Sequence, residues 1–188
     1  PRFTQIRDLI KDGAIGTIRH IHWTLSRTSS SVDLSGESNW RTEKVHAPGG
    51  YFDDLACHGL DLFDFLLGPI DQASGVSFNQ LGHYDVPDAV AASWLHASGA
   101  TGTGSWNFGA FARKDEVAIE GSSGSIAFSI FDDVPIVIRT AQGVNQITIG
   151  NPEHIQYHHV ENLIRHLKGG RKHPSTGRSA LRTACVMD

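Results

Sequence analysis

The stretch 88-DAVAASWLHASGATGTGSWNF-108 holds two short runs of aromatic, β-branched and small residues on either side of the turn residues 97–100. Runs of this length and composition, bounded by turn residues, are typical of strands. Parallel strands need a crossover of about a dozen residues or more, and the connection here is far shorter. The stretch therefore predicts two neighbouring antiparallel strands.

The same pattern of strand-like runs and turn residues extends over most of residues 71–149. Short runs rich in Val, Ile, Phe, Trp and Thr alternate with turn residues, and no helical pattern lies between them. This spacing again favours antiparallel pairing. The predicted strands are 72–80, 88–97, 101–108, 115–120, 124–130, 134–140 and 144–149.

Segments with helical periodicity lie on both sides of the strand-rich region. The predicted helices are 2–12, 51–67, 154–168 and 176–188, with a strand at 17–27 and a long loop at 28–47. This order predicts an α+β fold with a large, mostly antiparallel open sheet and helices on one face. The other face would be left uncovered, and Trp94, Trp106 and Phe108 are expected to pack a partner subunit there.

Composition narrows the function classes. The chain has 188 residues, 39% of them apolar, and a formal net charge of −4. This is enough for one packed domain, and a slightly acidic chain is a poor nucleic-acid binder because phosphates need a basic face. No apolar stretch is long enough to span a membrane. The two cysteines make no disulfide framework, so a cytoplasmic location is expected.

The sequence contains no dinucleotide-binding fingerprint. The nearest glycine pair, Gly102 and Gly104, lacks a third glycine and lies inside a predicted strand. A phosphate-binding turn needs a strand before it and a helix after it. Any nucleotide cofactor would therefore need another domain or another chain.

The predicted helix 51–67 carries the most informative polar residues. Its apolar stripe, which predicts the core face, comprises Phe52, Leu55, Ala56, Gly59, Phe63 and Leu66. Asp54, His58 and Asp61 form a second stripe, roughly 160° away at the helical repeat. A carboxylate one turn from an imidazole can hydrogen-bond it and stabilise its protonated form. Such a pair is suited to general acid–base catalysis.

Three interpretations of the Asp54/His58 pair remain open. The spacing alone favours an ordinary solvated helix face. Proton transfer is the second interpretation, and a zinc or iron site is the third, although no third ligand is evident nearby in the sequence. Gly49 and Gly50 at the start of the helix favour function, because they allow a ligand to approach the backbone closely.

Trp40, Arg41, Tyr51 and Asp61 are candidate substrate-binding residues. An arginine can grip a carboxylate or hydroxyl groups, and a tryptophan can cover the face of a sugar. Tyr51 lies in the first turn of the helix, and Asp61 shares the stripe of Asp54 and His58. Packing at the base of a loop, or solvation of the charged groups, is the ordinary alternative for each.

The segment 49-GGYFDDLACHGLDL-62, followed by 65-FLLGPI-70, resembles the C-terminal domain of the glucose–fructose oxidoreductase/inositol dehydrogenase (Gfo/Idh/MocA) family. The family pattern G-G-G-x-x-x-D-x-x-x-H-x-x-D is matched at Gly49, Gly50, Asp54, His58 and Asp61. Pro48 stands in place of the first glycine, which is a departure from the pattern. Weaker likeness extends through residues 13–16, 115–126 and 173–180.

The resemblance implies an NAD(P)-dependent oxidoreductase acting on a hydroxyl or carbonyl carbon of a sugar, cyclitol or related compound. The histidine matching His58 would transfer the hydroxyl proton, and the aspartate matching Asp54 would contact the substrate or tune that histidine. NAD or NADP would be bound mainly by an N-terminal Rossmann domain that this sequence lacks. Residues 1–188 are then expected to be a single C-terminal substrate-binding domain, inactive alone, that forms a homodimer or tetramer through the open sheet face.

Two other functions are compatible with the same sequence. One is a non-catalytic ligand-sensing or regulatory protein of the same fold, for which ligand binding without turnover would be the sign. The other is a metal-dependent enzyme that uses Asp54, His58 and a distant histidine, and metal analysis of the purified protein would detect it.

Overall fold

The structure, a computed structural model, describes all of residues 1–188. Its helices are α1 (Arg2–Lys11), α2 (Ser31–Ser35), α3 (Tyr51–Leu67), α4 (Tyr157–Leu167) and α5 (Gly177–Met187), with a 3₁₀ turn η1 (Trp40–Thr42). Its strands are β1 (Ile18–Ser26), β2 (Ile70–Phe78), β3 (Ala89–His96), β4 (Thr101–Asn107), β5 (Lys114–Gly121), β6 (Gly124–Phe128), β7 (Ile136–Thr140) and β8 (Gly143–Ile147). Every predicted long helix and strand is confirmed within a few residues at its ends.

The eight strands form one open sheet in the order β2-β3-β4-β1-β5-β6-β7-β8. Six of the seven neighbouring pairs are antiparallel, and β1 alone runs parallel to its neighbour β4. The predicted α+β class with a mostly antiparallel sheet is therefore confirmed. The parallel pair is accommodated because the chain leaves β1, crosses the sheet as α3 and returns through β2 and β3, which is the long crossover that parallel strands require.

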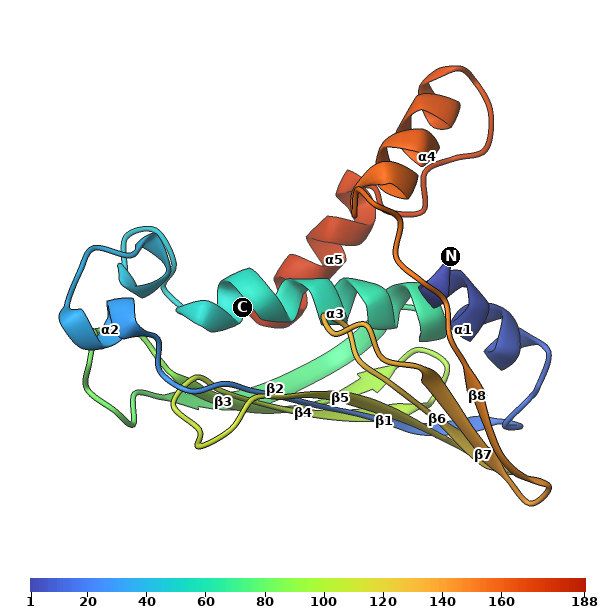
Figure 1. The fold of residues 1–188 in the computed structure, drawn as a ribbon, viewed down its shortest axis with the longest axis horizontal. Coiled ribbons are helices and arrows are strands. Elements are labelled where there is room, and N and C mark those ends of the chain that lie inside the picture. Colours follow the sequence, from blue (N-terminus) through green and yellow to red (C-terminus); the bar gives the residue numbers. More distant parts are fainter.

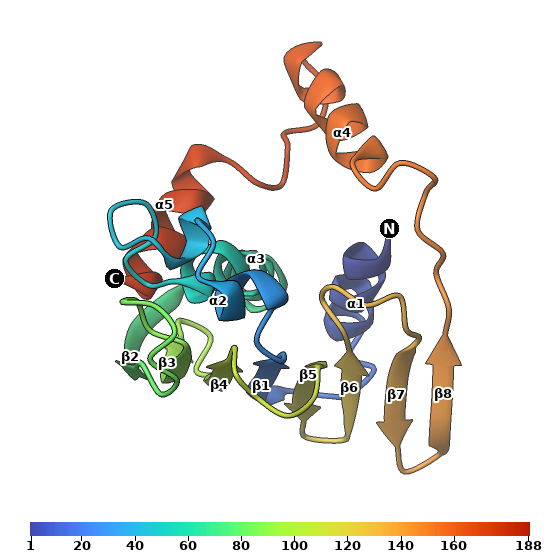
Figure 2. The same cartoon turned by 60° about the vertical axis from the view of Figure 1, so that its left-hand side comes forward.

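The helices lie over one face of the sheet (Figure 1). Helix α3 runs along the middle of that face, and α1 lies beside it over the later strands (Figure 2). Gly50 begins α3 with φ 69°, and a Cβ there would lie 2.6 Å from the carbonyl oxygen of Pro87. Glycine is thus required at this helix start both by its backbone conformation and by the close approach of the β2–β3 loop.

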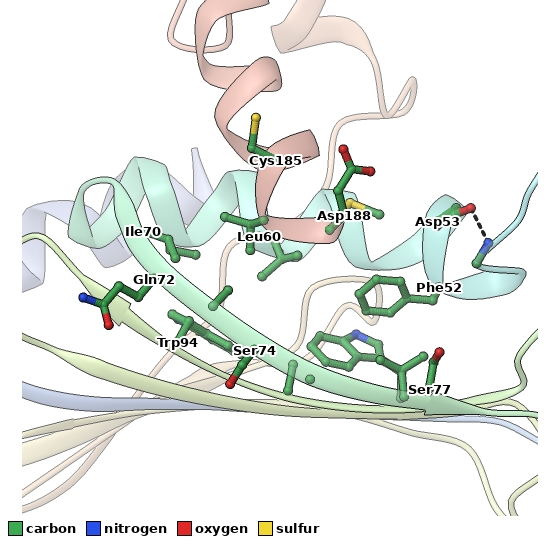
Figure 3. Close-up of a pocket in the computed structure, with 18 of the residues that line it drawn as sticks. Phe52, Asp53, Leu60, Ile70, Gln72, Ser74, Ser77, Trp94, Cys185 and Asp188 are labelled. Carbon is green, nitrogen blue, oxygen red and sulfur yellow. Dashed lines mark hydrogen bonds between the residues drawn. The ribbon is translucent and has the colours of Figure 1, made fainter.

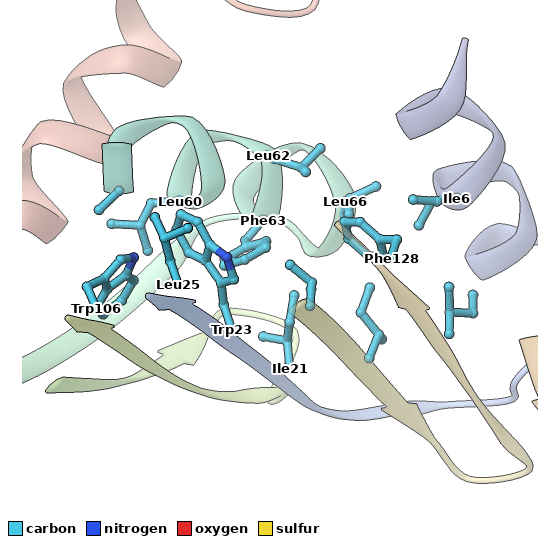
Figure 4. Packing of buried hydrophobic residues seen from close by; sticks show 14 of the residues in the cluster. Ile6, Ile21, Trp23, Leu25, Leu60, Leu62, Phe63, Leu66, Trp106 and Phe128 are labelled. Carbon is cyan, nitrogen blue, oxygen red and sulfur yellow. The ribbon is translucent and has the colours of Figure 1, made fainter. Parts of the chain in front are cut away.

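The core is centred on Trp23, which lies in β1 beneath α3 (Figure 4). Its ring is fully buried and packs edge-on against Phe63 and Trp106 at centroid distances of 5.7 and 5.3 Å. Gly59 of α3 lies directly over this ring, because a Cβ at Gly59 would be 2.3 Å from Cζ3 of Trp23. The glycine therefore sets how closely the helix approaches the sheet.

The prediction that Trp94, Trp106 and Phe108 face a partner subunit is wrong. All three are buried in the core, with exposed fractions of 5%, 1% and 0%. In β4 the inward positions are Gly102, Gly104 and Trp106, so the glycines leave room for the large rings and the outward positions are polar.

The centre of the uncovered sheet face, on β1 and β4, is lined by threonine side chains and two histidines. His20 hydrogen-bonds the hydroxyls of Thr101 and Thr103 at 2.9 and 3.0 Å, and His22 hydrogen-bonds those of Thr103 and Thr24, both at 2.9 Å. Burial, and then the neighbouring His22, lower the pKa of His20. Both ring nitrogens of each histidine therefore have a threonine partner along the centre of the face.

Residues 28–47 are not the structureless loop that the composition predicts. Ser30 caps α2, with its hydroxyl accepting from the Asp33 N–H while the Asp33 carboxylate accepts from the Ser30 N–H. The reciprocal pair stabilises a one-turn helix inside the segment. The segment is thus an ordered connection that contains α2 and η1, and η1 contacts α3.

Helix α4 stands away from the rest of the molecule, beyond α1 and α5 (Figure 2). Its apolar side chains Val160, Leu163, Ile164 and Leu167 are exposed. None of the five α-helices combines the length and the apolar character that crossing a bilayer requires.

We predict that Gly59→Ala destabilises the domain. In an open helix this change would raise the free energy of unfolding by about 1 kcal/mol. Here the new methyl group collides with the buried Trp23 ring, and we expect a decrease of about 1–3 kcal/mol, measured by urea denaturation. Gly177→Ala, at the start of α5 with no atom within 4 Å of the added Cβ, is the matched control and should be neutral or slightly stabilising. Equal effects of the two changes would contradict the proposed packing limit.

Candidate active site

Helix α3 presents Asp54 and His58 one turn apart, away from the buried stripe, as predicted. His58 is exposed, and the Asp54 side chain is 24% exposed. Five of the six residues of the predicted apolar stripe are buried, and Leu55 is half-buried. The two stripes of the helix therefore have the surroundings that their spacing indicates.

The hydrogen bond that the spacing of Asp54 and His58 allows is not formed, because the Asp54 carboxylate is bound by Arg41. Arg41 Nε donates to Asp54 Oδ2 at 2.6 Å, and the Arg41 guanidinium lies over the Trp40 ring at 4.5 Å. The charge-assisted bond from Arg41 takes the carboxylate because η1 lies beside the first turn of α3. The structure thus brings Trp40, Arg41 and Asp54 together as one cluster, with His58 one turn further along the helix.

Tyr51 lies at the base of this cluster and not at its surface. The side chain is buried, its hydroxyl donates to Asp33 Oδ1 at 2.6 Å, and it accepts from Asn39 Nδ2 at 2.7 Å. The Arg27 guanidinium covers the ring at 3.8 Å. The hydroxyl is therefore occupied by partners within the chain, and Tyr51 joins α3 to the 28–47 segment.

The buried carboxylate of Asp33 is the centre of that junction. Burial alone would raise its pKa, but the hydrogen bonds from Tyr51, Ser30 and Asn39 outweigh burial and lower it. Sequence reasoning missed this residue, although the Ser-x-x-Asp spacing at residues 30–33 is a helix-start signal that would have found α2.

Asp61 faces the start of α5 as well as the His58 end of the polar stripe. Burial, and then the nearby Asp64, raise the pKa of Asp61, while Ser175, Arg182 and His58 act in the opposite direction. Asp64 in turn binds Arg182 of α5 with two hydrogen bonds of 2.6 Å. Asp61 thus lies at the contact between α3 and α5, and the structure does not bring it to the Arg41 cluster.

A cavity of about 730 Å³ lies between α3, β2 and the end of α5 (Figure 3). Phe52 and Leu60 line it from α3, Trp94 from the sheet, Cys185 from α5, and Asp188 from the residue that follows α5. Neither Asp54 nor His58 is among its lining residues. This cavity is therefore separate from the polar stripe of α3 that carries the candidate chemistry.

The side chains of the chain form no group of three His, Cys, Asp or Glu residues placed to hold a metal ion. Asp54 and His58 accordingly have no third ligand within reach, and the distant histidine that a metal site would need is not brought to them. Cys57, the thiol on the same helix, has its pKa raised by burial and then by the Asp54 carboxylate, which disfavours the reactive thiolate.

A neighbour of His58 that the sequence did not indicate is Phe131, from the loop between β6 and β7. The two rings meet edge to face, with centroids 5.8 Å apart and planes at 89°. Nothing in the local spacing signals this contact, because Phe131 reaches the helix only through the folding of the sheet.

Comparison with known proteins agrees with this architecture. The family model described as GFO/IDH/MocA C-terminal domain matches residues 3–127. The chain belongs to the GFO/IDH/MocA C-terminal domain family. In this family member, the matched residues include β1, α3 and most of the sheet.

Three relatives show the extent of the similarity. Oxidoreductase P35 from Formosa agariphila is 29% identical over 191 residues, which cover 100% of this chain and 58% of that protein. The aldose–aldose oxidoreductase of Caulobacter crescentus, solved with glycerol, superposes with a TM-score of 0.83 at 18% identity, covering 99% of this chain and 56% of the other. Levoglucosan dehydrogenase, solved with NADH and levoglucosan, gives 0.80 at 22% identity, covering 97% and 59%.

The GFO/IDH/MocA domain described here thus spans 56–59% of the length of these relatives. At this identity the solved structures establish a shared fold, and what those proteins bind or convert remains a property of those proteins.

We predict a pH-dependent role for Asp33 in stability. Its lowered folded-state pKa means that the ionised carboxylate stabilises the fold above the unfolded pKa of about 3.9, and that this contribution is lost as the pH falls through the lower folded value. Asp33→Asn should reduce the free energy of unfolding by about 1–3 kcal/mol at pH 7, with the difference from the parent shrinking below about pH 4. Denaturant titrations across this pH range measure it.

Asp85→Asn is the matched control, since Asp85 is exposed. It should leave stability nearly unchanged at every pH. A difference for Asp33→Asn that persists undiminished at low pH would contradict the assigned hydrogen-bond network.

Proposed function

We propose that this chain is the single C-terminal, substrate-binding and proton-transfer domain of a longer NAD(P)-dependent oxidoreductase. Its substrate would be a sugar, cyclitol or related compound, and the reaction would take place at a hydroxyl or carbonyl carbon of that compound. The observation that carries the proposal is the exposed His58 on α3, one turn from the Asp54–Arg41–Trp40 cluster. The family membership and the shared fold of sugar-binding oxidoreductases support it.

In this function His58 moves the proton and the neighbouring cluster orients the substrate. The imidazole takes the hydroxyl proton when the alcohol is oxidised and returns it when the carbonyl is reduced. Trp40 is 46% exposed and offers an aromatic face to a sugar ring. Arg41 and Asp54, which are both partly exposed, can exchange part of their mutual bond for substrate hydroxyls.

Tyr51 and Asp61 are given supporting roles in this proposal. Tyr51 fixes the segment that carries Trp40 and Arg41, because Asp33 and Asn39 occupy its hydroxyl. Asp61 lies at the contact between α3 and α5 and helps to position α5. Neither side chain needs to touch the substrate directly for the site to work.

The nicotinamide cofactor would be held mainly by a nucleotide-binding domain that is not part of these 188 residues. Gly102 and Gly104, the nearest glycine pair, lie in β4 with a Cβ at either position blocked by the ring of Trp94 or Trp106. They cannot form the phosphate-binding turn, which opens a helix. When bound, NAD or NADP would accept or supply the hydride, and the isolated chain is expected to show no turnover.

The uncovered sheet face is the proposed surface for a homodimer or tetramer. It offers the His20, His22 and threonine side chains instead of the tryptophans first expected there. The polar centre of this face can contribute hydrogen bonds to such an interface.

We predict that His58→Ala in the full-length oxidoreductase lowers kcat by about 10²–10⁴-fold, because a general acid–base group is removed. Cofactor affinity, measured by fluorescence titration, should stay unchanged. His83→Ala, which removes an exposed histidine from the β2–β3 loop, is the matched control and should retain full kcat.

An unchanged kcat for His58→Ala would remove His58 from the chemical step. A full-length protein that binds sugars without any turnover would instead favour a ligand-sensing role. A purified protein that carries a stoichiometric metal ion needed for activity would favour the metal-dependent alternative.

A further inference from the structure

The imidazole of His58 needs an orienting neighbour, and the expected one is engaged elsewhere. Asp54, the carboxylate one turn away, is bonded to Arg41 at 2.6 Å. The close aromatic neighbour of the imidazole is Phe131, with ring centroids 5.8 Å apart and nearly perpendicular planes. An exposed side chain without a hydrogen-bond anchor keeps one rotamer only if packing holds it.

Phe131 lies in the loop 129–135 between β6 and β7, and one carboxylate fixes the start of this loop. Asp115 Oδ2 accepts from the Phe131 N–H at 2.6 Å and from the Ser129 hydroxyl. The same hydroxyl oxygen accepts from the Asp132 N–H at 2.8 Å. The backbone on both sides of Phe131 is thus bound directly or indirectly to Asp115.

Two arginines from outside the loop also bind it. Arg2 of α1, which is buried, donates to the carbonyl oxygens of Ser129 and Asp132 at 2.6 and 2.8 Å. Arg113 binds the Asp132 carboxylate at 2.6 Å. A loop tied to α1, β5 and itself in this way holds the position of the one aromatic side chain it carries.

The remaining oxygen of Asp115 connects the loop to the core. Asp115 Oδ1 accepts from the indole N–H of Trp23 at 2.9 Å, and the Trp23 ring lies 6.4 Å from the Phe131 ring. Trp23 also packs under Gly59, the residue that follows His58 on α3. The positions of His58 and Phe131 therefore both depend on the buried Trp23 ring.

We propose that Phe131, held by Asp115, keeps the His58 imidazole in the position from which it transfers a proton. Phe131 and Asp115 are then positioning residues for that step, and neither contacts the substrate. The idea rests on the proposed function for the transfer itself, while the orienting contact is a property of this chain.

The first test measures the order of the His58 side chain by NMR in the 188-residue chain. In Phe131→Ala we expect the three-bond couplings about χ1 of His58 to change from values of one rotamer to averaged values. In Asp115→Asn, which lacks one carboxylate oxygen, cross-relaxation between the Phe131 and His58 ring protons should be lost although both rings remain. Phe131→Tyr should preserve the single rotamer.

Phe111→Ala is the matched control, since Phe111 is fully exposed. It should leave the His58 couplings unchanged. Phe131 is 38% exposed, so its replacement is not expected to prevent folding even where Asp115→Asn does. Unaveraged couplings in Phe131→Ala would overturn the proposal.

The second test measures steady-state kinetics in the full-length oxidoreductase. Phe131→Ala should lower kcat by roughly ten- to a hundredfold with little change in KM, as for a misplaced reacting group, and Phe131→Tyr should restore kcat. An unchanged kcat in Phe131→Ala, in an enzyme that does need His58, would also overturn the proposal. If His58→Ala itself retains kcat, the proposed function fails, and the NMR result still decides whether Phe131 orients the imidazole.

Discussion

The contact between the Trp23 indole and the backbone of α3 at Gly59 is the constraint on which the rest of the structure depends. A glycine in the middle of a helix lowers helix stability, yet here no side chain would fit above the buried ring. The indole N–H is satisfied by Asp115 on the neighbouring strand. One side chain thus fixes the height of α3 above the sheet and its relation to β5 at the same time.

The polar stripe of α3 lies on this fixed helix, and two loops contact it. One loop brings Arg41 to Asp54 and is anchored at Asp33, while the other brings Phe131 to His58 and is anchored at Asp115. In both cases a carboxylate that accepts several hydrogen bonds organises an irregular segment. Multiple donors to one carboxylate are strong, directional contacts, so they can hold a loop where no regular element would.

Periodicity predicts the long helices and the strands, because α3 and the strands have apolar spacings that match their geometry, but it does not predict α2 and η1 within residues 28–47. It was not sufficient to predict partners. Trp94 of β3 belongs to the core because Gly102 on the neighbouring strand makes room for it, and Gly104 makes room for Trp106 two residues further along β4. Likewise, neighbours on one helix suggested that Asp54 binds His58, whereas Arg41 and Phe131 arrive from segments whose approach only the tertiary fold determines.

The central place of β1 has a consequence for how the domain assembles. This strand precedes the other seven in the sequence, but it pairs with β4 at Thr101–Asn107 and with β5 at Lys114–Gly121. During synthesis it must therefore wait for most of the sheet to be completed, and pairings of such long sequence separation slow folding. A chain that lost its first 26 residues would hold two separate half-sheets, β2-β3-β4 and β5-β6-β7-β8, with no strand to join them.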